Sequence, residues 1–352
     1  MKTIDFTKLA RPNIRSLKPY EAKETPCKVK LDANESPYSL PADKIFQAKN
    51  IIGGLNRYPN PEAKKLKKAI SKNLKINTDC ILLGNGSDEL IYYLITAFEG
   101  PVLYPVPTFS MYGIISQALG EKGIGIPLDK EFDLDTDKML AVIKKYNPKL
   151  IFLSSPNNPT GNCFSADRIL KIIEASKGIV IVDEAYQPFS SEKGFLPLLG
   201  DYKNLAILRT LSKIGFAALR VGFLIGDPGM IKEVNKVRLP FNLNAISQTM
   251  ALEAFKQKKI VDSRIKNITS ERERLFEELD NITGVSPYPS EANFILFKAK
   301  NANAVYRRLI KEGVLIRNLG SAVKDALRVT IGTPEENSFF IKALRKSVGG
   351  KK

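Results

Sequence analysis

The chain of 352 residues contains no histidine and only three cysteines, and both scarcities limit its chemistry. Without histidine there is no imidazole ligand for zinc and no Ser-His or Cys-His nucleophile. Proton transfer near neutral pH must then fall to lysine, carboxylate, tyrosine or cysteine. Cys27, Cys80 and Cys163 lie far apart and are odd in number, so we expect free thiols in a reducing cytoplasm and no disulfide framework.

Long apolar runs are also missing. No stretch approaches the roughly 20 apolar residues that a membrane helix needs, and residues 1–6 lack the apolar core of a signal peptide. We therefore expect no membrane partner. With 43% hydrophobic and 26% charged residues, the composition is that of a globular protein with room for two domains.

Positive charge is in excess, since 54 Lys and Arg against 37 Asp and Glu give a net charge of +17. Such a surplus suits nucleic acid, an acidic surface or phosphorylated small molecules. The lysines are spread along the chain, however, and no zinc finger, RNA-binding aromatic signature or leucine zipper accompanies them. We interpret them as solvated helix faces and expect no nucleic-acid partner.

Short apolar runs, at residues 81–83, 102–104, 150–153, 179–182, 205–208 and 221–226, read as strands separated by helical segments. The run at 179–182 is continuously β-branched, which is typical of a strand buried on both faces in a parallel sheet. The last hundred residues differ, because short strands there lie between two helices. We predict a large α/β domain at residues 28–250 and a small α+β domain formed by 1–27 and 251–352.

Polar side chains follow several of these strands directly. They are Ser87, Asn158, Asp183, Tyr186 and Lys213. Ligands of open α/β sheets bind beyond the carboxyl ends of the strands, where all five are expected to meet. An Asp that ends a buried strand needs a partner, and a protonated ring nitrogen is one candidate.

The segment at residues 209–220 presents Lys213 between Ser212 and, seven positions on, Arg220. A desolvated lysine, or one near a second cation, can act as a nucleophile and form a Schiff base. The alternative, an ordinary surface lysine, is disfavoured by the other motifs. Upstream, glycines 84 and 86 form a strand–turn–helix junction that suits a phosphate. There Ser87 is expected to cap the helix, and the carboxylates of Asp88 and Glu89 are expected to point away from the anion.

These motifs together resemble one family, the fold-type I pyridoxal-phosphate-dependent aminotransferases, and within it the histidinol-phosphate aminotransferases. The matching pieces are LDANE (31–35), RYPNP (57–61), GNGSDE (84–89), PNNPTG (156–161), DEAY (183–186), TLSK (210–213) and LRVTIG (327–332). They occur in the family's order and span nearly the whole chain. The resemblance implies an α/β fold whose mostly parallel central sheet is sandwiched by helices, next to a small α+β domain.

The resemblance also implies roles at the cofactor. Lys213 would hold pyridoxal phosphate as a Schiff base and then act as general base. Asp183 would pair with the pyridine nitrogen, and Tyr186 with Asn158 would bind the ring 3-oxygen. The residues expected at the phosphate are Ser87, Ser212 and Arg220, joined by Tyr58 from the other subunit of a homodimer. Asp88 is also counted among the cofactor-binding residues. Phe109, which on its own reads as a core residue, would stack on the ring.

For the substrate, Arg328 matches the arginine that grips the distal or carboxylate end in relatives, and Arg317 lies near it. Tyr20, Asn34 and Asn293 match positions that line the pocket. Two guanidinium forks suit a phosphate or a carboxylate equally well. One departure concerns Arg220, because its link to Lys213 is one residue shorter than is usual in the family. The turn must tighten or the arginine must reach from a shifted position.

The expected activity is therefore the aminotransfer step of histidine biosynthesis, with L-glutamate, 2-oxoglutarate and phosphorylated small molecules as substrates. An aromatic aminotransferase and a decarboxylase of phosphorylated threonine are alternatives within the family. A nucleic-acid-binding regulator that keeps the aminotransferase fold is an alternative of another class, because fold does not fix function.

Overall fold

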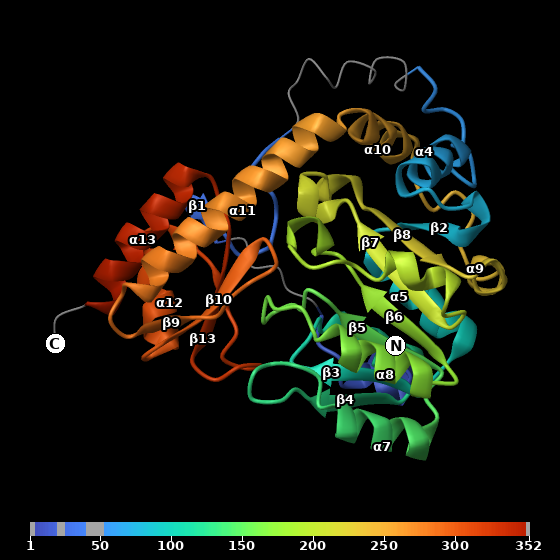
Figure 1. Ribbon diagram of the computed structural model, residues 1–352, viewed down its shortest axis with the longest axis horizontal. Coiled ribbons are helices and arrows are strands. Elements are labelled where there is room, and N and C mark those ends of the chain that lie inside the picture. The colour runs from blue at the N-terminus through green and yellow to red at the C-terminus, as the bar shows by residue number, and fades with distance from the viewer. Residues whose placement is uncertain (1–3, 20–24, 40–52, 350–352) are drawn as a thin grey trace.

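The computed structural model of the chain describes residues 4–19, 25–39 and 53–349. A sheet of seven strands forms its centre, in the spatial order β2-β8-β7-β6-β5-β3-β4 (Figure 1). Strands β3 to β7 pair in parallel, whereas β8 runs antiparallel to both β2 and β7. The bounds are β2 (Ile81–Asn85), β3 (Val102–Val106), β4 (Gly123–Pro127), β5 (Leu150–Ser154), β6 (Ile179–Asp183), β7 (Leu205–Thr210) and β8 (Val221–Gly226).

Apolar side chains alternate between the two faces of this sheet. In β6, for example, Val180 and Val182 join one buried cluster, and Ile181 joins the other. Both faces of the sheet are therefore buried, as the β-branched runs predicted. The predicted strands and the mostly parallel sheet are confirmed. Strand β4 was not anticipated, because its alternating glycines give it no continuous apolar run.

Helices cover both faces of the sheet, which confirms the predicted sandwich. One face packs on α4 (Lys64–Leu74), α7 (Thr136–Tyr146), α8 (Ala166–Ala175) and α10 (Ala245–Lys256). The other face packs on α5 (Ser87–Phe98), α6 (Met111–Leu119) and α9 (Pro228–Asn235). Short 3-10 turns complete the connections: η2 (Thr78–Cys80), η3 (Gln187–Phe189), η4 (Leu196–Gly200), η5 (Ser212–Ile214) and η6 (Ala217–Leu219).

The C-terminal part has an antiparallel sheet of its own, in the order β12-β13-β10-β9. Its elements are α11 (Lys258–Asp280), β9 (Val285–Pro287), β10 (Phe294–Ala299), α12 (Ala302–Lys311), β11 (Val314–Leu315), β12 (Arg317–Asn318), β13 (Ala326–Thr330) and α13 (Pro334–Val348). Helix α11 joins the two parts, since Val261 packs in a cluster of the central sheet and Leu275 in that of the smaller one (Figure 1).

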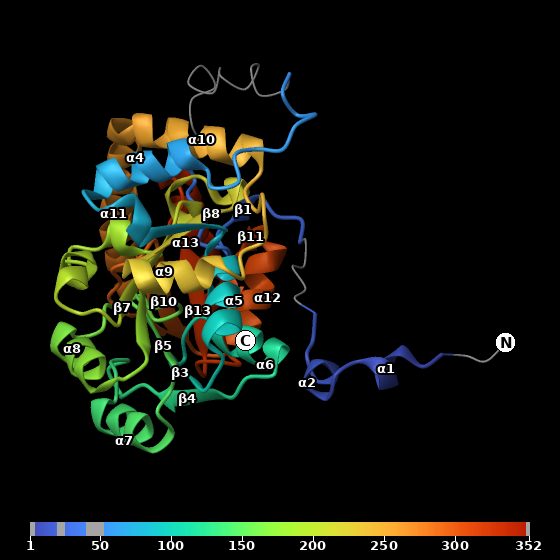
Figure 2. The ribbon, with the colours of Figure 1, turned by 90° about the vertical axis from the view of Figure 1, so that its right-hand side faces the viewer.

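The N-terminal residues reach both parts of the molecule. Strand β1 (Val29–Lys30) pairs in parallel with β11. Ahead of it, α1 (Phe6–Leu9) and α2 (Pro12–Arg15) form an arm that extends away from the body (Figure 2). The Nδ2 atom of Asn13 anchors this arm by donating to the carbonyl oxygen of Gln117 in α6, at 2.7 Å. The division into residues 28–250 and 1–27 with 251–352 stays a prediction. Among the described residues, no helix is long and apolar enough to cross a membrane.

Candidate functional site

The predicted polar residues gather at the carboxyl edge of the central sheet. Strands β5, β6 and β7 are direct neighbours, and Ser154 at the end of β5 pairs with Asp183 at the end of β6. The loops that follow these strands present Asn158, Tyr186 and Lys213 on the same edge. The parallel order thus brings together groups that are as much as 55 residues apart in sequence (158 to 213).

Asp183 is the most deeply placed of these groups, with 3% of its surface exposed. Its Oδ2 atom accepts a hydrogen bond from the hydroxyl of Tyr112 at 2.7 Å, and its Oδ1 atom accepts from the backbone N–H of Ala185 at 3.1 Å. Burial raises the pKa of Asp183 to about 6, while these two hydrogen bonds and the charge of Lys213 oppose the rise. Both oxygens are thus held by neutral donors, and the buried carboxylate is suited to a cationic partner.

Tyr186 is buried, and Asn34 connects it by hydrogen bonds to Asn293. Its hydroxyl accepts from Asn34 Nδ2 at 2.9 Å, and the carbonyl oxygen of Asn34 accepts from Asn293 Nδ2 at 3.0 Å. Asn34 has a left-handed backbone with φ of 55°, which asparagine tolerates better than most residues. The Oδ1 atom of Asn293 is buried without a hydrogen-bond partner among the described residues. That acceptor is available for a ligand.

Lys213 is carried by the short turn η5. The hydroxyl of Thr210, at the end of β7, donates to Ser212 Oγ at 2.8 Å and accepts from the Ser212 backbone N–H at 3.1 Å. This local pair starts the 3-10 turn that presents Lys213. The lysine is half-buried, and its Nζ atom lies 5.7 Å from the centre of the Tyr186 ring.

Arg220 reaches the glycine turn despite the short link. The chain between Lys213 and Arg220 forms two 3-10 turns separated by Gly215, with φ of 106°, and Arg220 itself is left-handed, with φ of 50°. Its Nη2 atom lies 3.1 Å from Asp88 Oδ2. A Cβ atom built on Gly86 would fall 2.3 Å from that same Nη2 atom. Gly86 thus leaves the space that the guanidinium occupies at the N-terminus of α5.

The expectations for the turn itself need correction. Gly86, with φ of 79°, is the N-cap of α5, and Ser87 is its first helical residue and does not cap it. The expectation that both carboxylates turn away holds for Glu89, which accepts from the backbone N–H of Asn85 at 2.6 Å. It is wrong for Asp88, which pairs with Arg220. The N-cap is a glycine, so no side chain caps the first turn of the helix. The positively charged guanidinium of Arg220 attracts the carboxylate of Asp88.

Asn158 and Arg328 connect the central sheet with the smaller one. The Oδ1 atom of Asn158 accepts from Arg328 Nη1 at 2.5 Å, and Arg328 Nη2 donates to the carbonyl oxygen of Asp32 at 2.7 Å. Arg317 lies directly opposite Arg328 in the β12–β13 ladder, so the two side chains share a face of the sheet. Like charges in that position repel each other, and an anion between them removes the repulsion.

Two of the remaining predicted residues, Phe109 and Tyr58, make contacts of their own, and one lies outside the described chain. Phe109 is half-buried and packs edge-on against Tyr112, at 5.6 Å between ring centres. Tyr58 is 81% exposed and stacks on Phe241 at 4.5 Å. Tyr20 lies outside the described residues.

Three functional candidates were missed from the sequence. Tyr112, which bonds Asp183, looked like an ordinary aromatic of the segment after β3. Glu184, which is buried, and Arg209, which is half-buried, form an ion pair, with Glu184 Oε2 at 2.8 Å from Arg209 Nε and 2.6 Å from Nη2. This pair links the strand end that carries Asp183 to the strand end that leads to Lys213. The only available signal was the position of each residue beside a predicted site residue.

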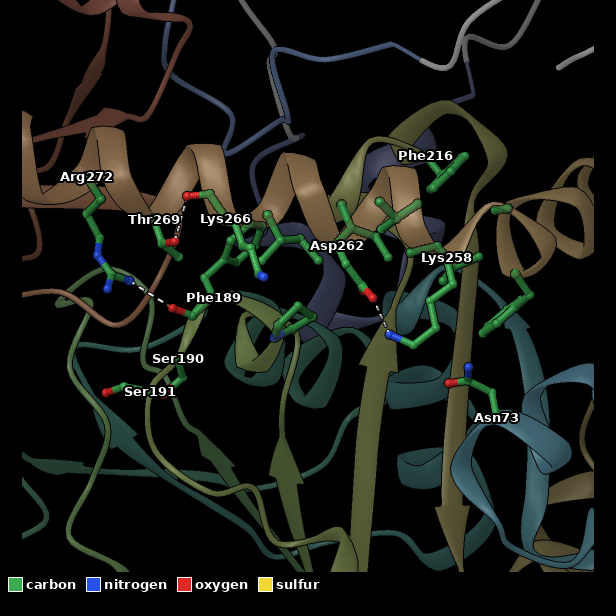
Figure 3. A pocket seen from close by; sticks show the side chains of 17 residues that line it. Asn73, Phe189, Ser190, Ser191, Phe216, Lys258, Asp262, Lys266, Thr269 and Arg272 are labelled. Carbon is green, nitrogen blue, oxygen red and sulfur yellow. Dashed lines mark hydrogen bonds and ion pairs between the residues drawn. The ribbon is translucent and has the colours of Figure 1, made fainter.

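A sizeable cavity in the described chain lies elsewhere. It has a volume of about 690 Å³ and lies beneath α11, where Asp262, Lys266 and Arg272 line it from above (Figure 3). None of the predicted site residues lines it, although Leu211 and Ile214 beside Lys213 do. Its walls are mainly apolar and hold no convergent catalytic groups, so the sheet edge remains the candidate site.

Comparisons with known proteins agree with this architecture. The model of the family "Aminotransferase class I and II" matches residues 26–344. Histidinol-phosphate aminotransferase 2 of Nitrosococcus oceani is 44% identical over 346 residues, which cover 95% of this chain and 96% of that protein. Histidinol-phosphate aminotransferase of Caldanaerobacter subterraneus subsp. tengcongensis is 40% identical, with 96% and 98% covered.

A solved structure is also similar. It is histidinol-phosphate aminotransferase from Sinorhizobium meliloti in complex with pyridoxal-5'-phosphate, and it covers 96% of this chain and 97% of its own. The TM-score is 0.85 at 24% sequence identity, so this likeness concerns the fold. The predicted fold class is thereby confirmed.

Proposed function

Because the chain belongs to the aminotransferase class I and II family, we propose that it is a pyridoxal-phosphate-dependent aminotransferase of histidine biosynthesis. It transfers an amino group between L-glutamate and imidazole-acetol phosphate, and the products are 2-oxoglutarate and histidinol phosphate. The observation that carries the proposal is the 44% identity to a curated histidinol-phosphate aminotransferase over 95% of the chain.

The residues at the sheet edge fit the cofactor. Asp183 is a buried carboxylate held only by neutral donors, which suits a protonated pyridine nitrogen. The guanidinium of Arg220, over the Gly86 turn and the N-terminus of α5, suits a phosphate. Pyridoxal phosphate, when bound, supplies an electron sink that stabilises negative charge at the substrate carbon. Ser87 and Ser212 complete the proposed phosphate site, and Asp88 lies beside it as the ion-pair partner of Arg220.

Lys213 is the group that we assign to covalent attachment of the cofactor and to proton transfer. Its position in η5, half-buried beside the Tyr186 ring, places the amine at the same edge as Asp183. With no histidine in the chain, a lysine amine is a reasonable carrier of the proton between the substrate carbon and the reacting group. Tyr186 and Asn158 are proposed as hydrogen-bond donors to the ring oxygen, and Phe109 as the stacking ring.

Arg317 and Arg328 are proposed to bind the acidic end of the substrate. Two arginines directly opposite each other in the β12–β13 ladder suit a dianion such as a phosphate ester. The buried Oδ1 atom of Asn293 and the side chain of Asn34 lie beside this site as polar contacts for the rest of the substrate. Tyr20 is proposed from the resemblance alone.

We further propose that the enzyme works as a homodimer in the cytoplasm. Several large apolar side chains are exposed on the described surface, namely Phe6, Leu9, Leu55, Tyr58, Leu239, Phe241 and Ile246. Burying such side chains in an interface is favourable. The stacked pair of Tyr58 and Phe241 is the feature through which one subunit would reach the phosphate site of the other.

Mixing two inactive variants tests this exchange. Tyr58→Ala lacks the contributed residue and Lys213→Ala lacks the amine, so a mixed dimer contains one site with both native residues. Random assortment then places about a quarter of all sites in the native state. Activity recovered to about that level supports the proposal. Two variants that stay inactive after verified subunit exchange would place Tyr58 in its own subunit's site. A Tyr58→Ala protein that is active by itself would show that Tyr58 serves neither site.

Product analysis tests the activity. We would incubate the loaded enzyme with L-glutamate and imidazole-acetol phosphate and measure histidinol phosphate and 2-oxoglutarate, which should accumulate in equal amounts. A separate incubation with phosphothreonine would be monitored for CO2. Release of CO2 without formation of histidinol phosphate would replace the proposal with a decarboxylase.

A further inference from the structure

Tyr112 occupies a position that the aminotransferase reaction leaves unassigned. It is the second residue of α6, its ring is fully buried, and it stacks on Phe152 of β5 at 4.8 Å with an interplanar angle of 12°. Phe109 packs edge-on against it, at 5.6 Å between ring centres. A ring confined by two aromatic neighbours has one orientation, and in that orientation its hydroxyl donates to Asp183 Oδ2 at 2.7 Å.

The carboxylate of Asp183 is held at both oxygens. The backbone N–H of Ala185 reaches Oδ1 and the hydroxyl of Tyr112 reaches Oδ2, so rotation of the carboxylate plane would break both hydrogen bonds. Each carboxylate oxygen has two lone pairs and therefore keeps one for another donor. The two protein donors thus orient the group without using up its capacity to bind a cation.

The other charged groups that act on this carboxylate come from neighbouring elements. Asp88 in α5 disfavours the ionised form, and Lys213 in η5 favours it. Burial is the largest influence and favours the neutral acid, as the raised pKa of about 6 reflects. The hydroxyl of Tyr112 is the side-chain hydrogen-bond donor that opposes it.

We propose that Tyr112 is a positioning residue for the reaction: its hydroxyl orients the Asp183 carboxylate and favours the ionised form, so that the carboxylate is ready for the ring nitrogen of pyridoxal phosphate. This inference rests on the proposed function, because the assignment of Asp183 to that nitrogen does. Tyr112 itself touches neither the substrate nor the reacting atoms in this account.

The test removes the hydroxyl and keeps the ring. Tyr112→Phe is compared with wild type and with Tyr104→Phe, which deletes a hydroxyl from another tyrosine of the same aromatic cluster. Equilibrium binding of pyridoxal phosphate is measured by absorbance from pH 5 to pH 8.5. Affinity falls with decreasing pH as Asp183 takes up a proton. In Tyr112→Phe this fall in affinity should occur at a pH about one unit or more higher. The free energy of a hydrogen bond to a charged group corresponds to a pKa shift of about that size.

The matched control separates the proposal from a simple packing effect. Tyr112→Phe differs from wild type only by the hydroxyl that bonds Asp183, so a displacement between the curves that is absent in Tyr104→Phe reports on that hydrogen bond. Tyr104→Phe should follow the wild-type curve. A Tyr112→Phe curve that overlies the wild-type curve, or one that is lowered equally at every pH, would overturn the proposal.

A second measurement needs no cofactor. The unfolding free energy of cofactor-free protein is followed against pH with and without Asp183→Asn, in the wild-type and in the Tyr112→Phe background. The difference in unfolding free energy that Asp183→Asn causes depends on pH. The midpoint of that dependence should lie about one pH unit higher in the Tyr112→Phe background than in the wild-type background. An unchanged midpoint would refute the role of Tyr112 alone. Failure of the wild-type protein to bind pyridoxal phosphate would instead refute the proposed function.

Discussion

Asp183→Asn is predicted to stabilise the cofactor-free protein at neutral and higher pH while it destroys the activity. The carboxylate is buried and, without the cofactor, has only neutral hydrogen-bond donors. Keeping it ionised is therefore costly to the folded state. Asparagine has nearly the same shape and no charge, and it can accept from the N–H of Ala185 while it donates to the hydroxyl of Tyr112.

The direction of the pH dependence follows from the raised pKa. Burial raises the pKa of Asp183 from 3.8 to about 6, so between these values the folded protein binds a proton that the unfolded chain does not. Stability from this group is fully present below about pH 4 and is lost as the pH rises through about 6. The shift of about two pKa units corresponds to about 3 kcal/mol at most. Asp183→Asn should therefore gain up to that amount relative to wild type between pH 4 and pH 8.

Denaturant unfolding of the cofactor-free proteins at several pH values measures this gain. Asp137→Asn, at an exposed carboxylate in the first turn of α7, serves as the control and should show little pH-dependent difference from wild type. The reasoning is refuted if Asp183→Asn shows no pH-dependent gain, or if it is most favourable at low pH. In the loaded enzyme the same variant should lose about a thousandfold in turnover, because the charge that stabilises the pyridinium is gone.

Three further predictions test how the site is held together. Gly86→Ala should reduce affinity for pyridoxal phosphate by about tenfold or more, because the added Cβ would lie 2.3 Å from Arg220 Nη2 and residue 86 has a positive φ. The control variant Gly200→Ala, where a Cβ would meet nothing within 4 Å, should bind the cofactor normally. Glu184→Gln should cost about 3 kcal/mol of unfolding free energy, because it leaves the guanidinium of Arg209 without its charged partner. The double variant with Arg209→Met should lose much less unfolding free energy than the sum of the two single variants, and strict additivity would contradict the coupling. Lys213→Ala should remove the absorbance of covalently attached pyridoxal phosphate, and a retained band would show that another amine holds it.

The sequence was sufficient where a local pattern determines the structure. Continuous apolar runs located the strands β5, β6 and β7, since a strand buried on both faces must be apolar throughout. The polar residues that end those runs then had to meet at one edge, because neighbouring parallel strands end together. Asp183 and Lys213 were found in this way.

Other features depend on contacts between distant segments, which no local pattern contains. Tyr112 binds an aspartate 71 positions away, and Asn158 binds an arginine 170 positions away. The antiparallel direction of β8 follows from the tight turns between Lys213 and Val221, which the composition of the segment does not specify. The glycine N-cap of α5 was mistaken for a serine cap because both residues suit that position and only φ distinguishes them.

The central claim is that this enzyme exchanges an amino group with a phosphorylated substrate through Lys213 and pyridoxal phosphate. A single half-reaction tests it most directly. Protein loaded with pyridoxal phosphate is mixed, without an amino acceptor, with histidinol phosphate, phenylalanine or phosphothreonine, and the absorbance band of the attached cofactor is followed. The account predicts rapid loss of the band with histidinol phosphate and much slower loss with the other two. Faster loss with phenylalanine would contradict the substrate assignment, and absence of an attached-cofactor band before mixing would contradict the role of Lys213.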